Sequence, residues 1–493
     1  MSQINTNVAA LIAQHNLGRA NQDMSVRLER LATGLRINRG ADDPAGLIVS
    51  ERLRAEVSGI GKAIDNIERA ANVIATGEAS LQEVNDLLND LKGLVIEAAN
   101  TGAFSNEEVE ANQLQIDSAI DSIKRIADTT SFAGLNLLDG SLGYITEDIV
   151  TSQMTDVNVY SARFGNNDQI PVNVEVLNSA QRADLFWPGD ADGTSAGSLT
   201  ESITFEIEGN TGTEVFSFAS GTALSAVAFA INNVSDATGV QAGLVDAADP
   251  TSGMTFTSVN FGSDAYVSVS VIEGGEDFQT YDAPAGAAAL RQNGQDVLAL
   301  VNGNLALGKG LDVSVRTGSL DMALTMTSAA AQTLNQTFTF NIAGGGATYQ
   351  IGPQVNTQQQ ASFGIGSVAP SRLGNSIVGF LSSLQSGGAN ALTSGDDTRE
   401  QAQNAAAIID ASIDQISTLR GRLGAFERNT LQTTMRSSQI ALENLTAAES
   451  SIRDADFARE TSQLTRAQIL QQAGTQTLSI ANENAANVLA LLQ

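Results

Sequence analysis

The sequence predicts a mainly α-helical protein with an α+β or β-rich insert, in which the N- and C-terminal helices pair as a coiled coil and helical bundle. Three observations support this fold class. Six of the seven prolines lie between Pro171 and Pro370, so both ends can be helical over long distances. Apolar residues at both ends recur at spacings of 3 and 4. The middle of the chain contains runs that alternate between apolar and polar residues, as strands do.

The first segment is expected to form a helix with a weak apolar stripe. The residues of that stripe are Val8, Leu11, Ile12, Leu28, Leu31 and Leu35. The run NRGADDPAG (38–46) is expected to end the helix. Asp42 or Asp43 can then accept amide hydrogens at the start of the next helix, and Pro44 suits its first turn.

A long helix is expected to follow from about residue 45, with Ile64 to Val95 spaced by 3 and 4 on either side of Glu78. Successive steps of three residues, Glu78 to Leu81 to Val84, predict a local shift in the phase of that stripe. A second helix is expected after the turn Thr101-Gly102-Ala103, and its buried face is predicted to hold Val109, Ile116, Ile120 and Ile123. The segment 132–140 is predicted to form a turn with short extended pieces.

The C-terminal part mirrors the N-terminal one. A helical stripe is expected to contain Ile409, Ile413, Ile416, Leu423, Phe426, Ile440 and Leu445. A last stripe contains Leu478, Ala481, Ala485, Val488 and Leu492, at alternating steps of 3 and 4. Residues 459–493 carry only four charged side chains, which favours burial of the back of this helix against other subunits.

The middle of the chain is predicted to be one or two small α+β or β-sandwich modules. Thr204 to Glu208 alternates strictly, 209–212 makes a turn, and Glu214 to Phe218 returns as a second strand. A short helix is expected at 224–231. Further strands are predicted at Val240, 254–259, 265–272 and 337–342.

These elements predict three layers in the chain. Residues 1–44 with 454–493 are expected to form a terminal coiled-coil core. Residues 45–150 with 391–453 are expected to form a helical bundle with a short β turn, and residues 151–390 a variable outer part. The outer part holds 21 acidic and 6 basic side chains, a composition that suits a solvated surface.

Composition argues against several functional classes. The net charge of −29 disfavours nucleic acid as a partner. The chain has no Cys and a single His, His15, so thiol chemistry is excluded, a Ser–His–Asp triad would have to use that one imidazole, and no cofactor or metal site is expected. No HExxH motif or phosphate-binding loop is present. No stretch reaches the ~18–20 apolar residues that would cross a membrane. The sequence therefore predicts a structural protein and no enzyme.

Long motifs at both ends resemble the bacterial flagellin family. The N-terminal motifs are LATGLRINRGADDPAGLIVSERLRA (31–55) and SFAGLNLLDG (131–140). The C-terminal motifs are ISTLRGRLGA (416–425), SIRDADFARETSQLTRAQILQQAG (451–474) and NVLALL (487–492). In addition, 203–243 resembles a small β-β-α insert found in many flagellins and hook-associated proteins.

The resemblance implies a structural subunit that self-assembles into the flagellar filament for swimming motility. It implies paired chain ends lining an export channel, and export without a cleavable signal through a type III apparatus to the cell exterior. It also implies a chaperone on the C-terminal helix, a filament cap, hook-junction proteins and further copies of the chain as partners. The candidate assembly residues are Leu28, Leu31, Leu35, Arg36, Asn38, Leu464, Leu470, Leu478, Ala481, Ala485, Val488 and Leu492.

Two residues depart from the family pattern. Ala485 stands where the family often has Pro, so the last helix is expected to run on unkinked. Asp90 aligns with an Arg through which a flagellin-sensing Toll-like receptor recognises many flagellins, so weak or absent receptor activation is expected.

Two alternative functions remain open at this stage. The chain could be the hook–filament junction protein, which shares both ends. It could also be a filament subunit whose insert is adhesive or displays glycans.

Overall fold

The computed structural model describes residues 6–102, 105–165, 167–188, 197–275, 278–284, 286–334, 336–394 and 398–490, without the side chains of 250 and 485–490. Two compact units divide the chain. The first contains Met1–Asn72, Tyr349–Ala361 and Ala425–Gln493, and the second contains Val73–Thr348 and Ser362–Gly424. Both units draw on segments that are far apart in sequence.

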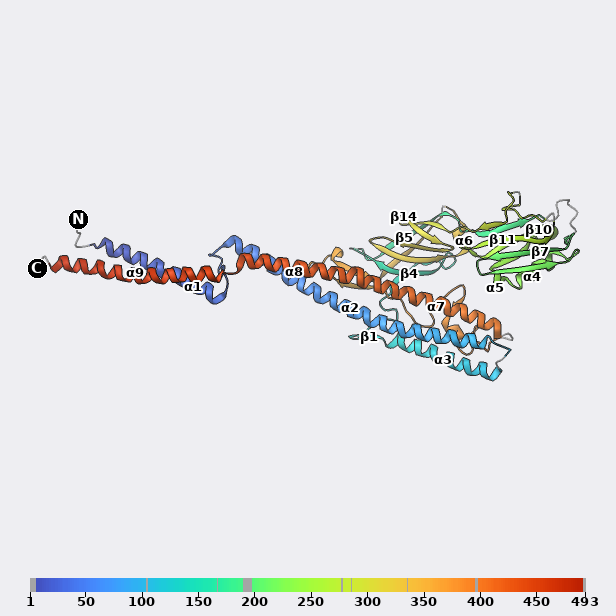
Figure 1. Cartoon of the computed structure of the whole chain (residues 1–493), viewed down its shortest axis with the longest axis horizontal. Helices are drawn as coiled ribbons and strands as arrows, with labels where there is room; N and C mark the ends of the chain where they lie inside the picture. Colours follow the sequence, from blue (N-terminus) through green and yellow to red (C-terminus); the bar gives the residue numbers. More distant parts are fainter. Residues whose placement is uncertain are drawn as a thin grey trace. The chain divides into compact units, whose positions relative to one another are not determined.

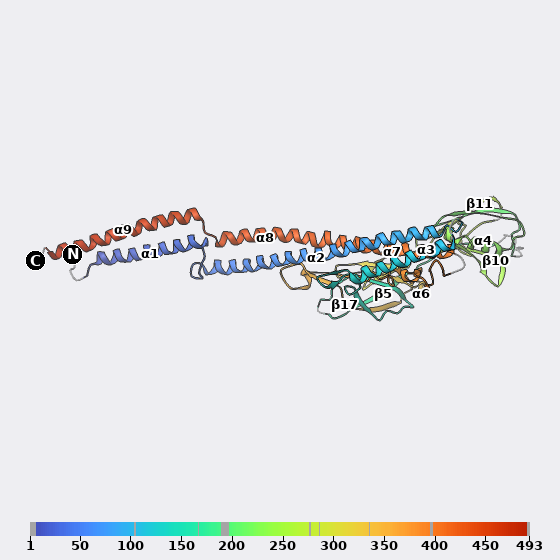
Figure 2. The ribbon, with the colours of Figure 1, turned by 90° about the horizontal axis from the view of Figure 1, so that it is seen from below.

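The first unit contains an antiparallel pair formed by the first and last helices, α1 (Val8–Thr33) and α9 (Phe457–Ala490). They lie side by side in both views (Figure 1, Figure 2). Buried or half-buried residues of α1 alternate by steps of 3 and 4, and these are Ala10, Ala13, Leu17, Ala20, Met24, Arg27 and Leu31. The facing residues of α9 follow the same pattern, and these are Glu460, Leu464, Ala467, Gln471, Gly474, Leu478 and Ala481.

Part of the apolar stripe expected on the first helix does not lie in this seam. Val8, Leu11 and Ile12 are 52%, 56% and 58% exposed. Small residues share the seam with Leu17, Met24 and Leu31, and a small residue lets two helix backbones approach closely. A Cβ added to Gly474 would lie 3.3 Å from Leu17 Cδ1, for example. Val8, Leu11 and Ile12 therefore face away from α9.

The first helix ends at Thr33, five residues before the predicted break at Asn38. Gly34 adopts a left-handed conformation with φ 73°, and its amide donates to Arg30 O, which closes the helix. The next helix, α2, spans Pro44–Ala98. Its predicted start is confirmed, because Asp43 Oδ1 accepts from the amide of Gly46 at 2.9 Å and Pro44 takes the first helical position.

The stripe of α2 keeps one phase, so the predicted shift at Glu78 is wrong. Its buried positions alternate without interruption, and these are Ile60, Ala63, Ile67, Ala70, Ile74, Gly77, Leu81, Val84, Leu88, Leu91, Val95 and Ala98. Gly77 occupies the stripe position that the sequence analysis assigned to Glu78. Glycine has no side chain, so it is not counted as apolar when the spacing is read from the sequence. The α-carbon of Gly77 faces Leu137, whose Cδ1 would lie 3.9 Å from an added Cβ.

The C-terminal helical region continues from α7 (Thr398–Phe426) through a π-helical segment, Glu427–Leu431, into α8 (Gln432–Arg453). Of the predicted stripe, Ile409, Ile416 and Leu423 are buried, and Ile413, Phe426 and Leu445 are half-buried, but Ile440 is 61% exposed. A π turn adds one residue to the helical turn and rotates the residues after it relative to the preceding face. Ile440 therefore lies outside the stripe.

The second unit contains a helical part in which α3 (Asn106–Thr129) and α7 lie beside the later part of α2 (Figure 1, Figure 2). A Ser105 capping box begins α3. The predicted face of α3 is confirmed, because Val109, Ile116, Ile120 and Ile123 are all buried. Short strands follow, as expected for 132–140, and these are β1 (Ser131–Phe132) and β2 (Leu135–Asn136). Farther along are the strands β20 (Gly374–Asn375) and β21 (Gly379–Phe380) and a 3₁₀ turn (Leu381–Leu384).

The first of two β bodies in this unit is an eight-stranded antiparallel sheet in the order β3-β17-β5-β13-β14-β15-β16-β4. Its strands are β3 (Tyr144–Glu147), β4 (Met154–Ala162), β5 (Ile170–Asn178), β13 (Leu298–Val301), β14 (Asn304–Lys309), β15 (Asp312–Arg316), β16 (Leu320–Met326) and β17 (Thr337–Gly345). One face of the sheet encloses a core, to which the helix α6 (Ser328–Gln332) contributes Ala330 and Ala331. We call the opposite face the outer face of the sheet.

Tyr144 ties the two edge strands of this sheet together. Its hydroxyl accepts from the amide of Ala162 at 2.9 Å and donates to Ala162 O at 3.3 Å, which links β3 to β4. Glycine leaves room for the ring at Gly346 and Gly364, where an added Cβ would approach it to 2.5 and 2.6 Å. The sheet therefore curls towards a barrel, which brings its two edges within reach of one side chain.

The second β body contains a sheet in the order β6-β10-β9 and another in the order β12-β11-β7-β8. Its strands are β6 (Arg182–Trp187), β7 (Ile203–Gly209), β8 (Thr213–Phe218), β9 (Val240–Asp246), β10 (Asp249–Phe261), β11 (Tyr266–Gly274) and β12 (Arg291–Asn293). The helix α4 (Leu224–Asn232) packs against β9 and β10, and α5 (Ser235–Thr238) follows it. Phe205 and Phe256 lie in the core of this body.

The predicted fold class is confirmed, with helical ends and a strand-rich insert. The strands expected near 204–208, 214–218, 254–259, 265–272 and 337–342, and the helix at 224–231, are all present. Further strands of the insert were not predicted, and these are β4 to β6, β12 to β16 and β18 to β21. No helix in the described part of the chain is long and apolar enough to cross a membrane.

A small hairpin in the first unit packs on α2. It lies between the strands β18 (Ala347–Gln350) and β19 (Gln360–Phe363) and contains a 3₁₀ turn, Thr357–Gln359. A Cβ added to Gly59 of α2 would lie 3.0 Å from Pro353 Cβ. Gly61, two residues farther along the helix, has nothing within 4 Å of an added Cβ. The glycine pair in Gly-Ile-Gly therefore has one member that is needed for packing and one that is not.

We expect Gly61→Ala to stabilise the chain by up to about 1 kcal/mol, because Ala is the better helix former. Gly59→Ala has the same helical gain but pushes Pro353 away, so its stability should lie below that of Gly61→Ala. Chemical unfolding of the two variants followed by circular dichroism measures the difference. Equal stabilisation by both substitutions would contradict the packing of Pro353 on Gly59.

Candidate assembly site

The helix pair α1/α9 is fixed at one end by a charged cluster. Arg27 Nη1 lies 3.0 Å from Glu460 Oε2, and Arg30 Nη1 lies 3.3 Å from Glu460 Oε1. The Glu460 side chain is only 7% exposed, and the two arginines are 23% and 19% exposed. At the other end the Asn7 side chain donates to Ala481 O at 2.9 Å. These contacts fix the register of a seam whose apolar contacts are small.

Backbone hydrogen bonds join the segment that follows α1 to the segment that follows α8, next to this cluster. Leu35 and Asp454 form an isolated antiparallel bridge. The amide of Arg36 donates to Arg453 O at 2.7 Å, and the amide of Ala455 donates to Gly34 O at 2.9 Å. The two connecting segments therefore pair with each other, which satisfies backbone groups that the helix ends leave open.

Side chains of the two end motifs add further contacts to this connection between the segments after α1 and α8, which we call the joint. The guanidinium of Arg36 donates to Ile452 O, and Arg453 Nη1 lies 2.8 Å from Glu51 Oε1 on α2. Asp456 Oδ1 accepts from the amides of Ala458 and Arg459 at 3.0 and 3.2 Å, which caps the start of α9. The polar residues of SIRDADFARE are thus used to end one helix and begin the next.

The loop between α1 and α2 is held by Asp42 and Asn38. Asp42 Oδ2 accepts from the amides of Arg39 at 2.9 Å and Asn38 at 3.0 Å, and these hydrogen bonds hold the pKa of the Asp42 carboxyl below its usual value. Asn38 Nδ2 donates to Leu35 O at 3.1 Å. Because the pKa is lowered in the folded chain, the loop gains stability above the ordinary pKa of Asp and loses it as the pH falls through the lowered value.

The structure separates the predicted assembly residues into groups. Leu31, Leu464, Leu478 and Ala481 are half-buried in the α1/α9 seam, and Leu35, Arg36 and Asn38 belong to the joint. Leu28 and Leu470 are each 50% exposed, on the outside of the pair. Ala485 and Val488 continue α9 without a break in the helix, and Leu492 lies outside the described residues.

Sequence reasoning missed three alanines of the seam and Glu460, the charged partner that Arg27 and Arg30 share. Ala13, Ala20 and Ala467 are buried, at 5%, 7% and 4% exposure. An alanine heptad carries the same spacing signal as a leucine heptad, but it is weaker on any hydrophobicity scale. Glu460 could have been found only by pairing the two chain ends.

Several large apolar side chains remain exposed on the α1/α9 pair. They are about half exposed or more, and these are Val8, Leu11, Ile12, Leu28, Phe457, Ile469, Leu470 and Ile480. Single exposed apolar residues are normal, but eight on two helices leave much apolar surface in water. Contact with other chains would remove this surface from water.

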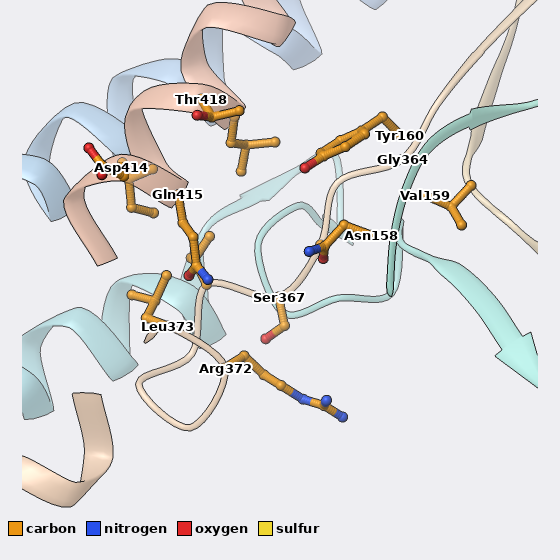
Figure 3. Close-up of a pocket in the computed structure, with 14 residues that line it drawn as sticks. Asn158, Val159, Tyr160, Gly364, Ser367, Arg372, Leu373, Asp414, Gln415 and Thr418 are labelled. Atoms are coloured by element: carbon orange, nitrogen blue, oxygen red, sulfur yellow. The ribbon is translucent and has the colours of Figure 1, made fainter. Parts of the chain in front are cut away.

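A cavity with a mainly apolar lining lies elsewhere, in the second unit. It has a volume of about 280 Å³. Figure 3 shows Asn158 and Tyr160 of β4 facing Gln415 and Thr418 of α7. Arg422 lies 3.5 Å from the centre of the Tyr160 ring and 2.8 Å from Asp321, which holds α7 against the sheet. The side chain of Gln415 is bound to the backbone of Gly374 on both its atoms.

Polar and apolar side chains of α7 and β4 line this cavity together. Its lining contains Ser367 and Asp414 but neither His nor Lys. Burial raises the pKa of the Tyr160 hydroxyl, and the nearby Arg422 opposes that shift. Among the described residues there is no cluster of three or more His, Asp or Glu that could hold a metal ion. The cavity is a junction between helix and sheet.

Comparison with known proteins identifies the family to which this arrangement belongs. The bacterial flagellin N-terminal helical region matches residues 4–142, the bacterial flagellin C-terminal helical region matches 406–492, and the flagellin hook IN motif matches 204–260. The B-type flagellin of Pseudomonas aeruginosa is 30% identical over 99% of both chains. The chain belongs to the bacterial flagellin family.

Other flagellins match over the same extent. The flagellin of Salmonella muenchen is 27% identical and flagellin A of Helicobacter pylori is 26% identical, each over 99% of both chains. Among solved structures, a flagellar hook-associated protein 3 of Legionella pneumophila covers 82% of this chain and 98% of its own, at 12% identity and a TM-score of 0.31. Superposition at that level supports no conclusion about this flagellin.

The family membership settles the main function. This flagellin is a structural subunit that self-assembles into the bacterial flagellar filament, an extracellular structure, for swimming motility. The resemblance deduced from the end motifs is therefore confirmed, as is the similarity of 203–243 to a small insert, since the hook IN motif covers 204–260.

We expect Glu460→Gln to destabilise the filament by about 2 kcal/mol per subunit, because it leaves Arg27 and Arg30 without their buried partner. The matched control is Glu29→Gln, which breaks the Arg39–Glu29 pair at 3.0 Å, where the side chains are 72% and 35% exposed. That pair should contribute less than about 1 kcal/mol. The depolymerisation temperature of filaments measures both effects, and an equal loss in the two variants would contradict a special role for Glu460.

Proposed function

We propose that the α1/α9 pair forms the innermost layer of the filament and lines its export channel, and that it orders fully only when neighbouring subunits cover it. The eight exposed large apolar side chains on α1 and α9 carry this proposal. The thin seam supports it, because Ala13, Ala20 and Ala467 contribute little apolar burial and the pair is weakly stabilised on its own.

The three sequence layers correspond to three roles in this proposal. Residues 1–44 with 454–493 form the core, 45–150 with 391–453 form the tube wall, and 151–390 form the outer surface. The charge distribution supports the last assignment, since 151–390 hold 21 acidic and 6 basic side chains and suit exposure to solvent.

Export and its partners follow from the same features. We infer that the chain travels unfolded through a type III apparatus by a route that needs no cleavable signal, and that a chaperone covers the apolar face of α9 beforehand. Ile469, Leu470 and Ile480, which are 60%, 50% and 50% exposed, offer that face. The absence of Cys avoids cross-links in transit. Cap and hook-junction proteins are the further proposed partners.

In vitro polymerisation tests this proposal. The purified chain should grow into long tubes from filament seeds. A chain lacking residues 457–493 should stay monomeric, because it has lost α9 and the ion pairs of Glu460. Electron microscopy and sedimentation measure assembly, and an unchanged thermal transition of the β bodies shows that the truncated chain is otherwise folded. Long tubes from the truncated chain would contradict the proposal, and a full chain that forms only short junction-like assemblies would favour the alternative.

The second proposal concerns Asp90, which is exposed on α2. Asp86, one turn before it, is also exposed, so this part of the helix presents two carboxylates at adjacent positions. Lys92 is engaged with Asp410 of α7 and does not neutralise them. We propose that this acidic surface weakens binding to the flagellin-sensing Toll-like receptor.

Monomers should therefore activate the receptor weakly in a reporter-cell assay. Asp90→Arg should raise their potency by at least about tenfold, because a charge reversal at a desolvated contact changes the binding free energy by more than about 1.4 kcal/mol. The control is Asp65→Arg, which reverses an exposed charge about seven turns earlier on the same helix. Full potency of the unchanged monomer would overturn the proposal.

A further inference from the structure

The outer face of the eight-stranded sheet carries a cluster of exposed leucines. Leu300 of β13 pairs with Leu305 of β14, and in the same register Leu298 falls opposite Leu307. Leu305 is 65% exposed and Leu307 is 76% exposed, while Leu298 and Leu300 are half-buried. We call these four residues the leucine patch.

The patch is not part of the core of the sheet. Ala299, Val301 and Ala306 alternate with the leucines along the same two strands, and all three are buried at 0%, 1% and 2% exposure. Strand geometry sends alternate side chains to opposite faces. The core therefore already has its apolar residues on these strands, and the leucines add nothing to it.

One row of paired residues runs from the patch to the helix α7. Leu307 pairs with Ser314 of β15, Ser314 with Ala323 of β16, and Ala323 with Asn158 of β4. Asn158 lines the cavity beneath α7. The outer face is thus covered by α7 at the end that holds Asn158 and left open at the end that holds Leu307.

The patch itself is uncharged, unlike most of the insert surface. Residues 151–390 carry 21 acidic and 6 basic side chains, so two copies of the insert repel each other over most of their surfaces. The border of the patch is mixed, since Lys309 of β14 and Arg316 of β15 lie beside it and Glu175 of β5 pairs with Leu300. Both cations are themselves paired with carboxylates, Lys309 with Asp264 and Arg316 with Asp321.

We propose that the leucine patch is a contact surface between inserts of neighbouring subunits, and that its occupant is a second copy of this chain. The proposal rests on filament assembly, which places copies beside one another at high local concentration, so that a weak patch is filled by its own neighbour. The four leucines carry no charge, so the patch is where one acidic insert can approach another with least repulsion. A contact between a patch and a different surface of the next copy repeats along a helical polymer without closing.

Thiol accessibility tests the contact directly, because the chain has no Cys and a single substitution gives a single thiol. Leu305→Cys places the thiol in the patch, and Gln241→Cys places it at an exposed position of β9 in the other β body. Both thiols should react with a maleimide-coupled polyethylene glycol at similar rates in monomers. In filaments, the thiol at position 305 should react about tenfold more slowly, because reaction requires local opening of the contact, while the thiol at position 241 keeps its monomer rate.

A second measurement uses a variant that keeps the fold but removes the patch. Filaments of the double variant Leu305→Gln/Leu307→Gln should depolymerise at a lower temperature than the unchanged chain, although the monomers melt alike. The control is Val215→Gln, which removes an apolar side chain that is 52% exposed on β8. It should leave the depolymerisation temperature unchanged.

The outcomes separate the contact from filament assembly itself. Filaments in which the thiol at position 305 reacts as fast as in monomers would overturn the contact and leave the filament function intact. A chain that forms no filaments would refute the function on which the proposal rests. Slower reaction at 305 together with the lower depolymerisation temperature of the double variant supports the contact.

Discussion

The thin seam between the first and last helices is the constraint on which the rest of this flagellin depends. The 26 residues of α1 and the 34 residues of α9 meet through alanine, glycine and a few leucines. Alanine at a position where a stable coiled coil has leucine forgoes about 2–5 kcal/mol of apolar burial. Ordering each residue costs about 1–2 kcal/mol of backbone entropy, so the pair alone has little to offset that cost. Other large apolar residues, such as Leu11, Ile12 and Ile469, lie on the outside, where they can stabilise the pair only through contact with other chains.

Polar groups supply the specificity that the seam lacks. Glu460 with Arg27 and Arg30 sets the axial position of α9 on α1, and the bridge between Leu35 and Asp454 sets the position at which α1 ends and α9 begins. Charged and backbone hydrogen bonds depend on distance and angle, whereas alanine contacts tolerate sliding. The long end motifs therefore consist largely of residues that end, cap or align helices. This explains why they are rich in Asp, Arg and Gly.

The helical ends could be predicted from the sequence because their apolar residues recur over many turns. The predicted helix faces were wrong where the apolar pattern did not reveal a residue's position. Gly77 lies in the α2 seam, and the π segment before α8 rotates Ile440 to the surface. Of the missed strands, β13 and β14 give no alternation, because leucines occupy their outer positions. In β5 the alternation of Val172, Val174 and Val176 was present, but Pro171 makes the segment look unlike a central strand.

The assembly site could be predicted only in part, because it joins residues that are more than 400 positions apart. Leu31, Leu478 and Ala481 follow from the spacing on each helix, but no spacing rule brings Arg27 and Glu460 together. Exposure of Leu28 and Leu470 was also not visible in the pattern, since an apolar residue facing another subunit resembles one facing its own core. The spacing of apolar residues in one chain does not distinguish contacts within that chain from contacts between copies.

Hydrogen exchange at the backbone amides of α1 and α9, compared between monomers and filaments, tests the central claim most directly, with α3 as the internal reference. If the seam is too thin to hold the pair alone, these amides exchange rapidly in the monomer and become as protected as those of α3 in the filament. Amides of α1 and α9 that are already protected in the monomer to the level of α3 would contradict the account.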